Sequence, residues 1–163
     1  MQLIKDQAFD EERALYGSRD IEAVRLKFDG PADGESAFKE SRNITVKDCF
    51  FNLRYPFWHA KNVVIKDSIV KGEYLAWYCE NVTFINCTIT GTQPLCYCKG
   101  LKLINCRMID CDLSFEKSDV DADIVSSVTS IKNPKSGNIR AIAVGDLIMD
   151  DPDARAVVTV APR

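Results

Sequence analysis

A motif that returns every 19 residues dominates this sequence. One copy begins at Ser41 and reads Ser-Arg-Asn-Ile-Thr-Val-Lys-Asp-Cys-Phe-Phe, and comparable segments begin at Ala60, Cys79 and Cys98. A polar or glycine residue precedes the first apolar position of each copy, and these anchor residues are Asp20, Asn43, Asn62, Asn81, Gly100, Asp119 and Asn138. The first interval between anchors is 23 residues and the others are 19. Such a fixed period predicts a solenoid, in which each repeat buries its apolar face only against its neighbours.

Within each repeat, apolar residues stand one and three positions after the anchor, with a mostly polar residue between them, as in Ile44-Thr45-Val46. This period of two predicts a strand with one buried face. A second short strand is expected six to eight positions after the anchor, and a third strand before it. Asp or Asn recurs at the fifth position, where a left-handed corner between the first two strands is expected.

These features predict an all-β fold, a single-stranded right-handed parallel β-helix of about seven coils with a 19-residue period. A hexapeptide-repeat solenoid is the alternative, and the lack of a strict six-residue period argues against it. We expect one domain over 1–163, with an N-terminal cap at 1–17, coils at 18–145 and a C-terminal cap at 146–163. The turn-rich segment 29–35 is expected to bulge from one coil. Segment 154–160 is expected to order the C-terminal edge, by pairing with the last coil or with another subunit in a homo-oligomer.

The seven cysteines are predicted to be buried free thiols. Cys49, Cys87 and Cys106 share one inward repeat position, and Cys79 and Cys98 share another. No paired Cys-x-x-Cys spacing supports a metal site. We therefore expect no metal and no cofactor.

The charge balance bears on partners and on location. The net charge is −3, which predicts no binding to nucleic acid and none to an anionic membrane. The first eight residues lack the basic and then apolar pattern of a signal peptide, so we expect a cytoplasmic protein.

Two rows of the predicted third strand should face solvent on the same side of the solenoid. We expect the row four residues before each anchor, which includes Trp58 and Trp77, to point inward instead. The outward rows are Ser36, Tyr55, Tyr74, Gln93 and Asp112, and Glu40, His59, Tyr78, Tyr97 and Glu116. One interpretation is a structural ladder of stacked aromatic residues. The other is a non-catalytic binding module that presents this aromatic and acidic stripe to a carbohydrate or an extended peptide.

Two further functions remain open. Glu40 and His59 should lie one coil apart, where they could act as acid and base in a carbohydrate-active enzyme of the lyase or hydrolase type. A purely structural or assembly protein is the third hypothesis. Asp48 and Asp67 are interpreted as corner residues rather than calcium ligands, because Lys47 neighbours the first.

Four segments carry a resemblance to a known family. They are 9–18, 52–59, 91–100 and 132–137, and they resemble the bacterial domain of unknown function 3737 (DUF3737) over roughly residues 8 to 151. The resemblance implies a single-stranded right-handed β-helix related in shape to pectin lyases. Members look longer, with extra coils where this chain passes directly from His59 to Ala60. The resemblance implies no established activity and no catalytic residues.

Overall fold

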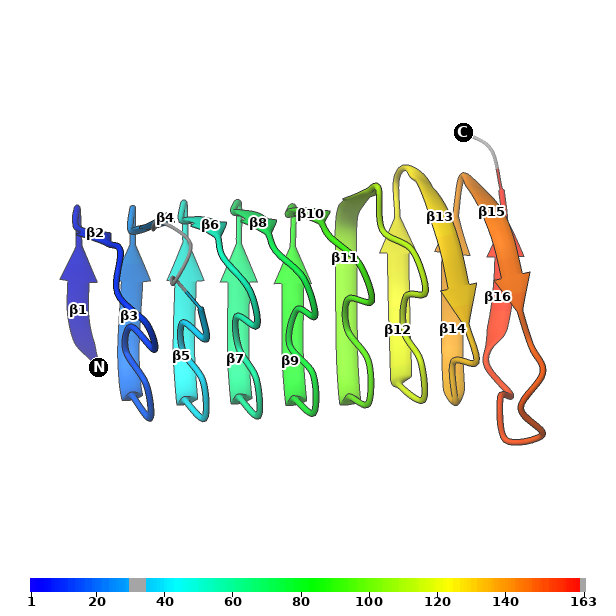
Figure 1. Cartoon of the computed structure of the whole chain (residues 1–163), viewed down its shortest axis with the longest axis horizontal. Helices are drawn as coiled ribbons and strands as arrows, with labels where there is room; N and C mark the ends of the chain where they lie inside the picture. The colour runs from blue at the N-terminus through cyan, green and yellow to red at the C-terminus, as the bar shows by residue number, and fades with distance from the viewer. Residues whose placement is uncertain (30–34, 162–163) are drawn as a thin grey trace.

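The computed structural model describes residues 1–29 and 35–161, and it is an all-β parallel solenoid of about eight turns (Figure 1). Within these residues nine strands form the longer of the two strand faces, where they pair in parallel and are stacked one after another along the solenoid axis. In spatial order they are β1 (Gln2–Lys5), β3 (Arg19–Val24), β5 (Arg42–Lys47), β7 (Lys61–Lys66), β9 (Glu80–Ile85), β11 (Lys99–Ile109), β12 (Asp119–Ile124), β14 (Ser136–Ala141) and β16 (Val157–Val160). Within the described residues there is no helix that could cross a membrane.

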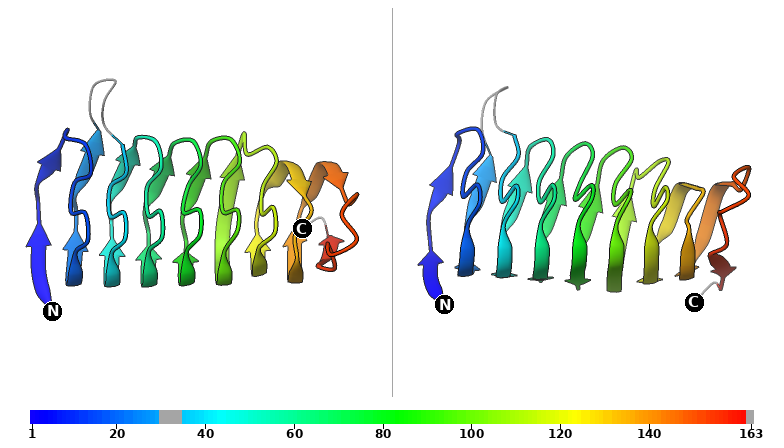
Figure 2. Two further views of the ribbon diagram at one scale, coloured as in Figure 1. Left: turned by 60° about the horizontal axis from the view of Figure 1, so that its bottom comes forward. Right: turned by 90° about the horizontal axis from the view of Figure 1, so that it is seen from below.

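The second face consists of shorter strands that follow a sharp corner. They are β2 (Ala8–Phe9), β4 (Lys27–Asp29), β6 (Phe50–Asn52), β8 (Ile69–Lys71) and β10 (Thr88–Thr90), and the end of β11 continues their sheet. Beyond it, β13 (Ser127–Lys132) and β15 (Ala143–Ile148) form a separate parallel pair. Figure 2 shows the regular rise of the coils from the N-terminus to the C-terminus.

The register confirms the predicted 19-residue period. Ile44 pairs with Val63 and Val63 with Val82, so equivalent side chains lie directly above one another. Arg19 pairs with Arg42, 23 positions on, which confirms that one interval is longer and that the register resumes after it. Most of the predicted bulge at 29–35 lies outside the described residues. The first strands, β1 and β2, pair with β3 and β4 in the same 19-residue register.

Near the C-terminus the predicted register is wrong by two residues. Val120 pairs with Gly137 and Ala122 with Ile139, so this coil closes with 17 residues rather than 19. Side chains alternate between the two faces of a strand, and a slip of two positions therefore leaves the same set buried. For this reason the apolar pattern alone could not reveal the shorter coil.

The strand expected beyond the repeats is present and pairs within the chain. β16 lies parallel to β14, with Ile139 opposite Val158, and Val158 packs against the core. Of the two predicted pairings for segment 154–160, the structure contains the one with the last coil.

Positive φ angles explain both recurring polar positions. Asp48, Asp67, Asn86 and Asn105 have φ values of 53°, 51°, 54° and 53°, which confirms the left-handed corner. The first five anchors, from Asp20 to Gly100, are also left-handed, as at Asn62 with φ 56°. Asp, Asn and Gly adopt this conformation at the lowest steric cost.

The narrow core is filled by rows of stacked side chains. At the N-terminal end Phe28 lies between Phe9 and Phe51, with ring centroids 5.0 and 4.6 Å apart, and Phe38 stacks on Phe57 at 5.3 Å. Val70, Ile89 and Met108 continue the row of Phe51, and all three are buried. The stacked core fixes the coils in position and so sets the spacing of every outward row.

Candidate functional site

The third segment of each coil carries the predicted site, and among the described residues it is a run of turns rather than a strand. Alternate residues have positive φ, as at Tyr55, Phe57 and His59 with 58°, 62° and 55°. Their N–H groups donate alternately to the two neighbouring coils: Phe57 donates to Ala37, whereas Tyr55 and His59 donate to the coil above. The backbone is therefore satisfied without an extended ladder.

This geometry makes the predicted inward row wrong at the two tryptophans. Trp58 and Trp77 are half-buried on the outer surface, and Phe57 and Ala76 fill the core in their place. Tyr16, from the same row, has 49% of its surface exposed. Cys96 and Phe115 are buried as expected. Ser36, expected to face solvent, is buried. Because the segment is not extended, simple alternation assigned the wrong residues to the interior.

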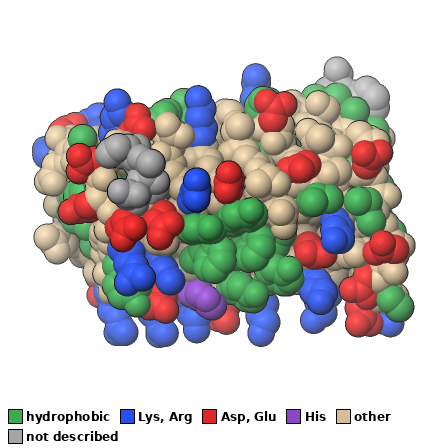
Figure 3. Space-filling view, in the orientation of Figure 1, with side chains coloured by type: hydrophobic (Ala, Val, Ile, Leu, Met, Phe, Trp, Pro, Cys, Tyr) green, Lys and Arg blue, Asp and Glu red, His purple; other side chains and the backbone are tan. Residues whose placement is uncertain are grey.

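Seven rings gather on this outer surface, and we call them the aromatic wall. They are Tyr55, Trp58, His59, Tyr74, Trp77, Tyr78 and Tyr97. Figure 3 shows the wall as an apolar patch near the centre of the molecule, with the histidine at its lower margin. The structure thus brings together the predicted tyrosines and His59, and adds the two tryptophans.

Within the wall the rings form three stacks along the solenoid axis. Tyr55 and Tyr74 are 5.4 Å apart with planes at 13°, and Trp58 and Trp77 are 5.2 Å apart at 10°. His59, Tyr78 and Tyr97 form a continuous stack with centroid distances of 5.0 and 5.0 Å. Tyr78 and Tyr97 are therefore immediate neighbours, as the 19-residue period predicted.

The stacking determines what the wall presents to solvent. Face-to-face contacts cover the ring faces inside each stack, and the ring edges and hydroxyls point outward. In an aromatic ring the edge carries partial positive charge and the face partial negative charge. The wall is consequently a surface of weakly positive edges and hydroxyl groups rather than a set of open platforms.

Some polar groups of the wall already form hydrogen bonds within the protein, and others do not. The indole N–H groups of Trp58 and Trp77 donate to the backbone oxygens of Tyr74 and Gln93 at 2.6 and 2.7 Å, which fixes both rings. The hydroxyls of Tyr55, Tyr74 and Tyr78 form no hydrogen bond to any residue that the structure describes. Tyr78 has 44% of its surface exposed. These hydroxyls are therefore available to a ligand.

Tyr97 belongs to a chain of contacts at the C-terminal end of the wall. Its hydroxyl donates to Glu116 Oε1 at 3.1 Å, and Glu116 Oε2 lies 3.3 Å from Lys132 Nζ. Burial and the bond to Glu116 raise the pKa of Tyr97 to about 12. The hydroxyl therefore stays protonated and holds the predicted site residue Glu116 beside the wall.

The remaining ligand candidates extend the row of Tyr55 and Tyr74. The N–H of Gln93 donates to the backbone oxygen of Asp112 at 2.9 Å, so these residues occupy successive coils beyond Tyr74. Both side chains are partly exposed. The row thus changes from aromatic to polar along the axis.

Glu40 and His59 line one surface groove of about 380 Å³ with Gly17, Arg19, Arg42 and Lys61. The carboxylate of Glu40 accepts a hydrogen bond from the Tyr16 hydroxyl, which raises the pKa of Tyr16. In the described structure no hydrogen bond or ion pair joins Glu40 to His59. Glu40 and His59 therefore line the same groove but do not form an acid–base pair in this structure.

A second groove of about 560 Å³ lies beside the C-terminal end of the wall. Its lining combines aromatic, cationic and hydrogen-bonding groups, namely Tyr78, Tyr97, Cys98, Lys99, Lys117, Asp119, Lys135 and Ser136. The lysines of this groove were not among the predicted site residues. The signal was present in the sequence, because a cation stands one position before the anchor in several repeats, as at Arg42, Lys61 and Lys99.

All seven cysteines lie in the described part of the chain, and all are buried and free, as predicted. The Sγ atoms of Cys79 and Cys98 are 3.0 Å apart, which confirms the expected stacking. No group of three or more His, Cys, Asp or Glu side chains that could hold a metal ion occurs within the described ranges. These cysteines act as small core residues.

The buried thiols predict a loss of stability in alkali. Burial raises the pKa of Cys96 and of Cys111 to about 12 from an ordinary 9.0. Their contribution to stability is fully present below pH 9 and is lost as the pH rises towards 12, because the unfolded thiols release their protons first. Each thiol should add about 1.4 kcal/mol per pH unit to the fall in the free energy of unfolding. Urea unfolding of the wild type and of Cys96→Ala between pH 9 and 10.5 should therefore give slopes that differ by about this amount. Equal slopes would contradict the prediction.

A protein-family model matches most of this chain. The family model described as "Protein of unknown function (DUF3737)" matches residues 2–65 and 57–160. The chain belongs to the DUF3737 family. A search of curated proteins and a search of solved structures each found no match. Family membership and the solenoid fold of this DUF3737 protein thus agree with the resemblance noted in the sequence.

Proposed function

We propose that this DUF3737 protein is a non-catalytic binding module that holds a carbohydrate chain along its aromatic wall. The single observation that carries the proposal is the 560 Å³ groove in which Tyr78 and Tyr97 lie beside lysine, aspartate and serine side chains. Ligand sites combine apolar and aromatic surface with a few convergent polar groups. Sugars need this combination, because they have apolar C–H groups and many hydroxyls.

The state of the wall's polar atoms favours a carbohydrate over an extended peptide. A peptide that adds to a sheet edge needs free backbone N–H and C=O groups. In the wall the N–H groups of Tyr55, His59 and Tyr78 already donate to neighbouring coils. The hydroxyls of Tyr55, Tyr74 and Tyr78, in contrast, are free of partners among the described residues, and they can both donate to and accept from sugar hydroxyls.

The two tryptophans provide a direct test, because they are the only ones in the chain and both belong to the wall. We expect tryptophan emission to change on titration with a panel of linear oligosaccharides, neutral and acidic. Tyr78→Ala together with Tyr97→Ala should weaken binding of the best ligand at least tenfold, since each removes ring and hydroxyl contacts.

Ile104→Ala is the matched control, because Ile104 has 47% of its surface exposed and lies on β11, outside the wall. This variant should bind as the wild type does. Failure of every oligosaccharide in the panel to bind, or equal weakening by the control, would refute the proposed function. Circular dichroism of each variant establishes that the fold is retained.

A further inference from the structure

We infer that the carbohydrate is acidic, and that a row of cations beside the aromatic wall binds its negative groups. The inference rests on the proposed function and names the class of ligand. We call this row the basic edge, and its members are Arg19, Arg42, Lys61, Lys99, Lys117, Lys135 and Arg155. Each stands at or just before the start of a strand of the long face.

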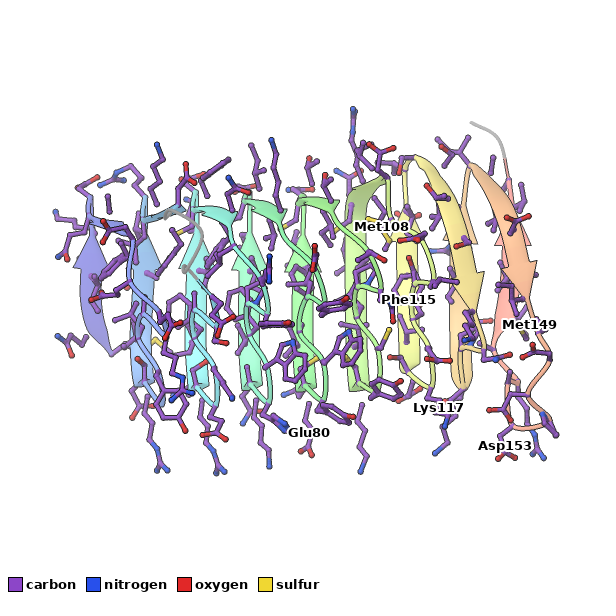
Figure 4. The ribbon with its side chains drawn as sticks, viewed as in Figure 1. Glu80, Met108, Phe115, Lys117, Met149 and Asp153 are labelled. Atoms are coloured by element: carbon purple, nitrogen blue, oxygen red, sulfur yellow. The ribbon has the colours of Figure 1, made fainter. Side chains whose placement is uncertain are left out.

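The register places the first three of these cations one above another. Arg19 pairs with Arg42, and Arg42 with Lys61. Lys99, Lys117 and Lys135 line one groove, and Lys135 lines the next with Arg155. Eight consecutive strands thus carry seven cations, and Glu80 occupies the remaining position. Figure 4 shows the labelled residues Glu80 and Lys117 on this same lower edge.

The basic edge directly adjoins the aromatic wall. In two coils an outward wall residue, one buried residue and a cation of the edge follow one another, namely His59-Ala60-Lys61 and Tyr97-Cys98-Lys99. The two surfaces therefore run in parallel along the axis. A single extended ligand could touch hydroxyls on the wall and cations on the edge.

The free protein does not neutralise the N-terminal half of this edge. Lys61 lies 3.6 Å from Glu80, whereas Arg19 and Arg42 form no ion pair with any carboxylate that the structure describes. Like charges directly opposite one another on neighbouring strands are destabilising. Arg19 and Arg42 nevertheless occupy adjacent positions, although the whole chain has a net charge of −3.

Two carboxylates near the edge have other partners. Glu40 accepts the Tyr16 hydroxyl. Asp119 accepts bonds from Ser136 Oγ at 2.9 Å and from the Gly100 N–H at 3.3 Å. Asp153 also lines the grooves at the C-terminal end, close to Lys135. These acids space the cations but leave the edge with more positive than negative groups.

The spacing of the cations along the solenoid axis indicates which kind of polyanion can bind. Neighbouring coils are about 4.8 Å apart, so the edge from Arg19 to Arg155 spans roughly 34 Å over seven steps. A linear chain of pyranose rings advances by about one coil spacing per ring, whereas side chains on one face of an extended peptide recur only every ~6.6 Å. Single-stranded nucleic acid binds on open aromatic faces, and in this wall the faces are stacked on each other. An acidic polysaccharide with one charge per sugar fits best.

The test compares three ligands on the intact chain: a linear polyuronate, a neutral glucan of equal length, and a single-stranded oligonucleotide of equal charge. We expect the polyuronate to bind at least tenfold more tightly than either, with an affinity that falls as salt rises. Arg42→Glu should weaken polyuronate binding at least fivefold. It should also raise the Tm of the free protein, because a carboxylate would then lie between Arg19 and Lys61.

Lys66→Glu is the matched control, because it changes the net charge equally but lies at the other end of β7. It should leave polyuronate binding unchanged. Equal binding of the glucan, tighter binding of the oligonucleotide, or equal weakening by Lys66→Glu would overturn the inference. Equal binding of the glucan and the polyuronate would leave the proposed function standing, whereas no binding of any sugar would refute both.

Discussion

Replacing Phe51 with alanine should lower the free energy of unfolding by about 3–5 kcal/mol, as is usual for truncating a fully buried phenylalanine. Phe51 has no exposed surface, and its ring lies 4.6 Å from that of Phe28 and 5.1 Å from that of Phe57. A solenoid coil packs only against its neighbours, so no distant part of the chain can move in to fill the cavity. Urea unfolding followed by circular dichroism measures the loss.

Phe50 provides a matched control at the adjacent position. It is half-buried, points away from the core, and contacts Lys71 with its ring. Phe50→Ala should therefore cost less than about 1 kcal/mol, as is usual for partly exposed sites. Phe51→Leu keeps most of the volume and should cost less than about 1.5 kcal/mol. A loss of similar size in Phe50→Ala and Phe51→Ala would show that the core is not organised as described.

Much of the fold could be predicted from the sequence because the repeat converts sequence distance into height along the axis. Once Asn62 and Asn81 are equivalent, the pairing of Val63 with Val82 and the contact between Cys79 and Cys98 follow. The corners were also predictable, since Asp67 and its equivalents are residue types that accept positive φ.

The third segment could not be predicted with the same accuracy. Its alternate positive φ angles fall on residues such as Tyr55 and Phe57, and bulky aromatic side chains rarely adopt a left-handed backbone. The sequence pattern therefore predicts an extended strand with Trp58 on its buried face. The 17-residue coil could not be predicted for a different reason. The two-residue slip at Ile139 leaves the same face of the strand buried, so the apolar pattern does not change.

The candidate site was predicted in part. The stacking of Tyr78 on Tyr97 follows from the period, but its consequence, that ring edges rather than faces reach solvent, needed the ring planes. The basic edge was present in the sequence at Arg42 and Lys61, and it becomes significant only when the structure shows that no described carboxylate neutralises Arg42.

Replacing Gly91 with alanine should destabilise the protein on the order of 3 kcal/mol or more, because a forbidden backbone angle and a backbone clash add. Gly91 follows β10 with φ 144°, and a Cβ there would lie 2.1 Å from the backbone oxygen of Gly72. That oxygen belongs to the coil below, so relieving the clash requires the two coils to separate. We expect a large drop in Tm.

Gly100 is the matched control, since it is an anchor with φ 63° and a Cβ there would meet nothing closer than 3.7 Å. The equivalent residues Asn62 and Asn81 have φ values of 56° and 52°, and the Asn81 amide donates to Asn62 Oδ1 at 2.7 Å. Gly100→Asn should therefore change stability by less than about 0.5 kcal/mol, because asparagine tolerates this conformation and can extend the amide ladder. If Gly100→Asn destabilised the protein as much as Gly91→Ala, backbone conformation alone would explain both losses, and the close approach of the coils at Gly72 would have no separate role.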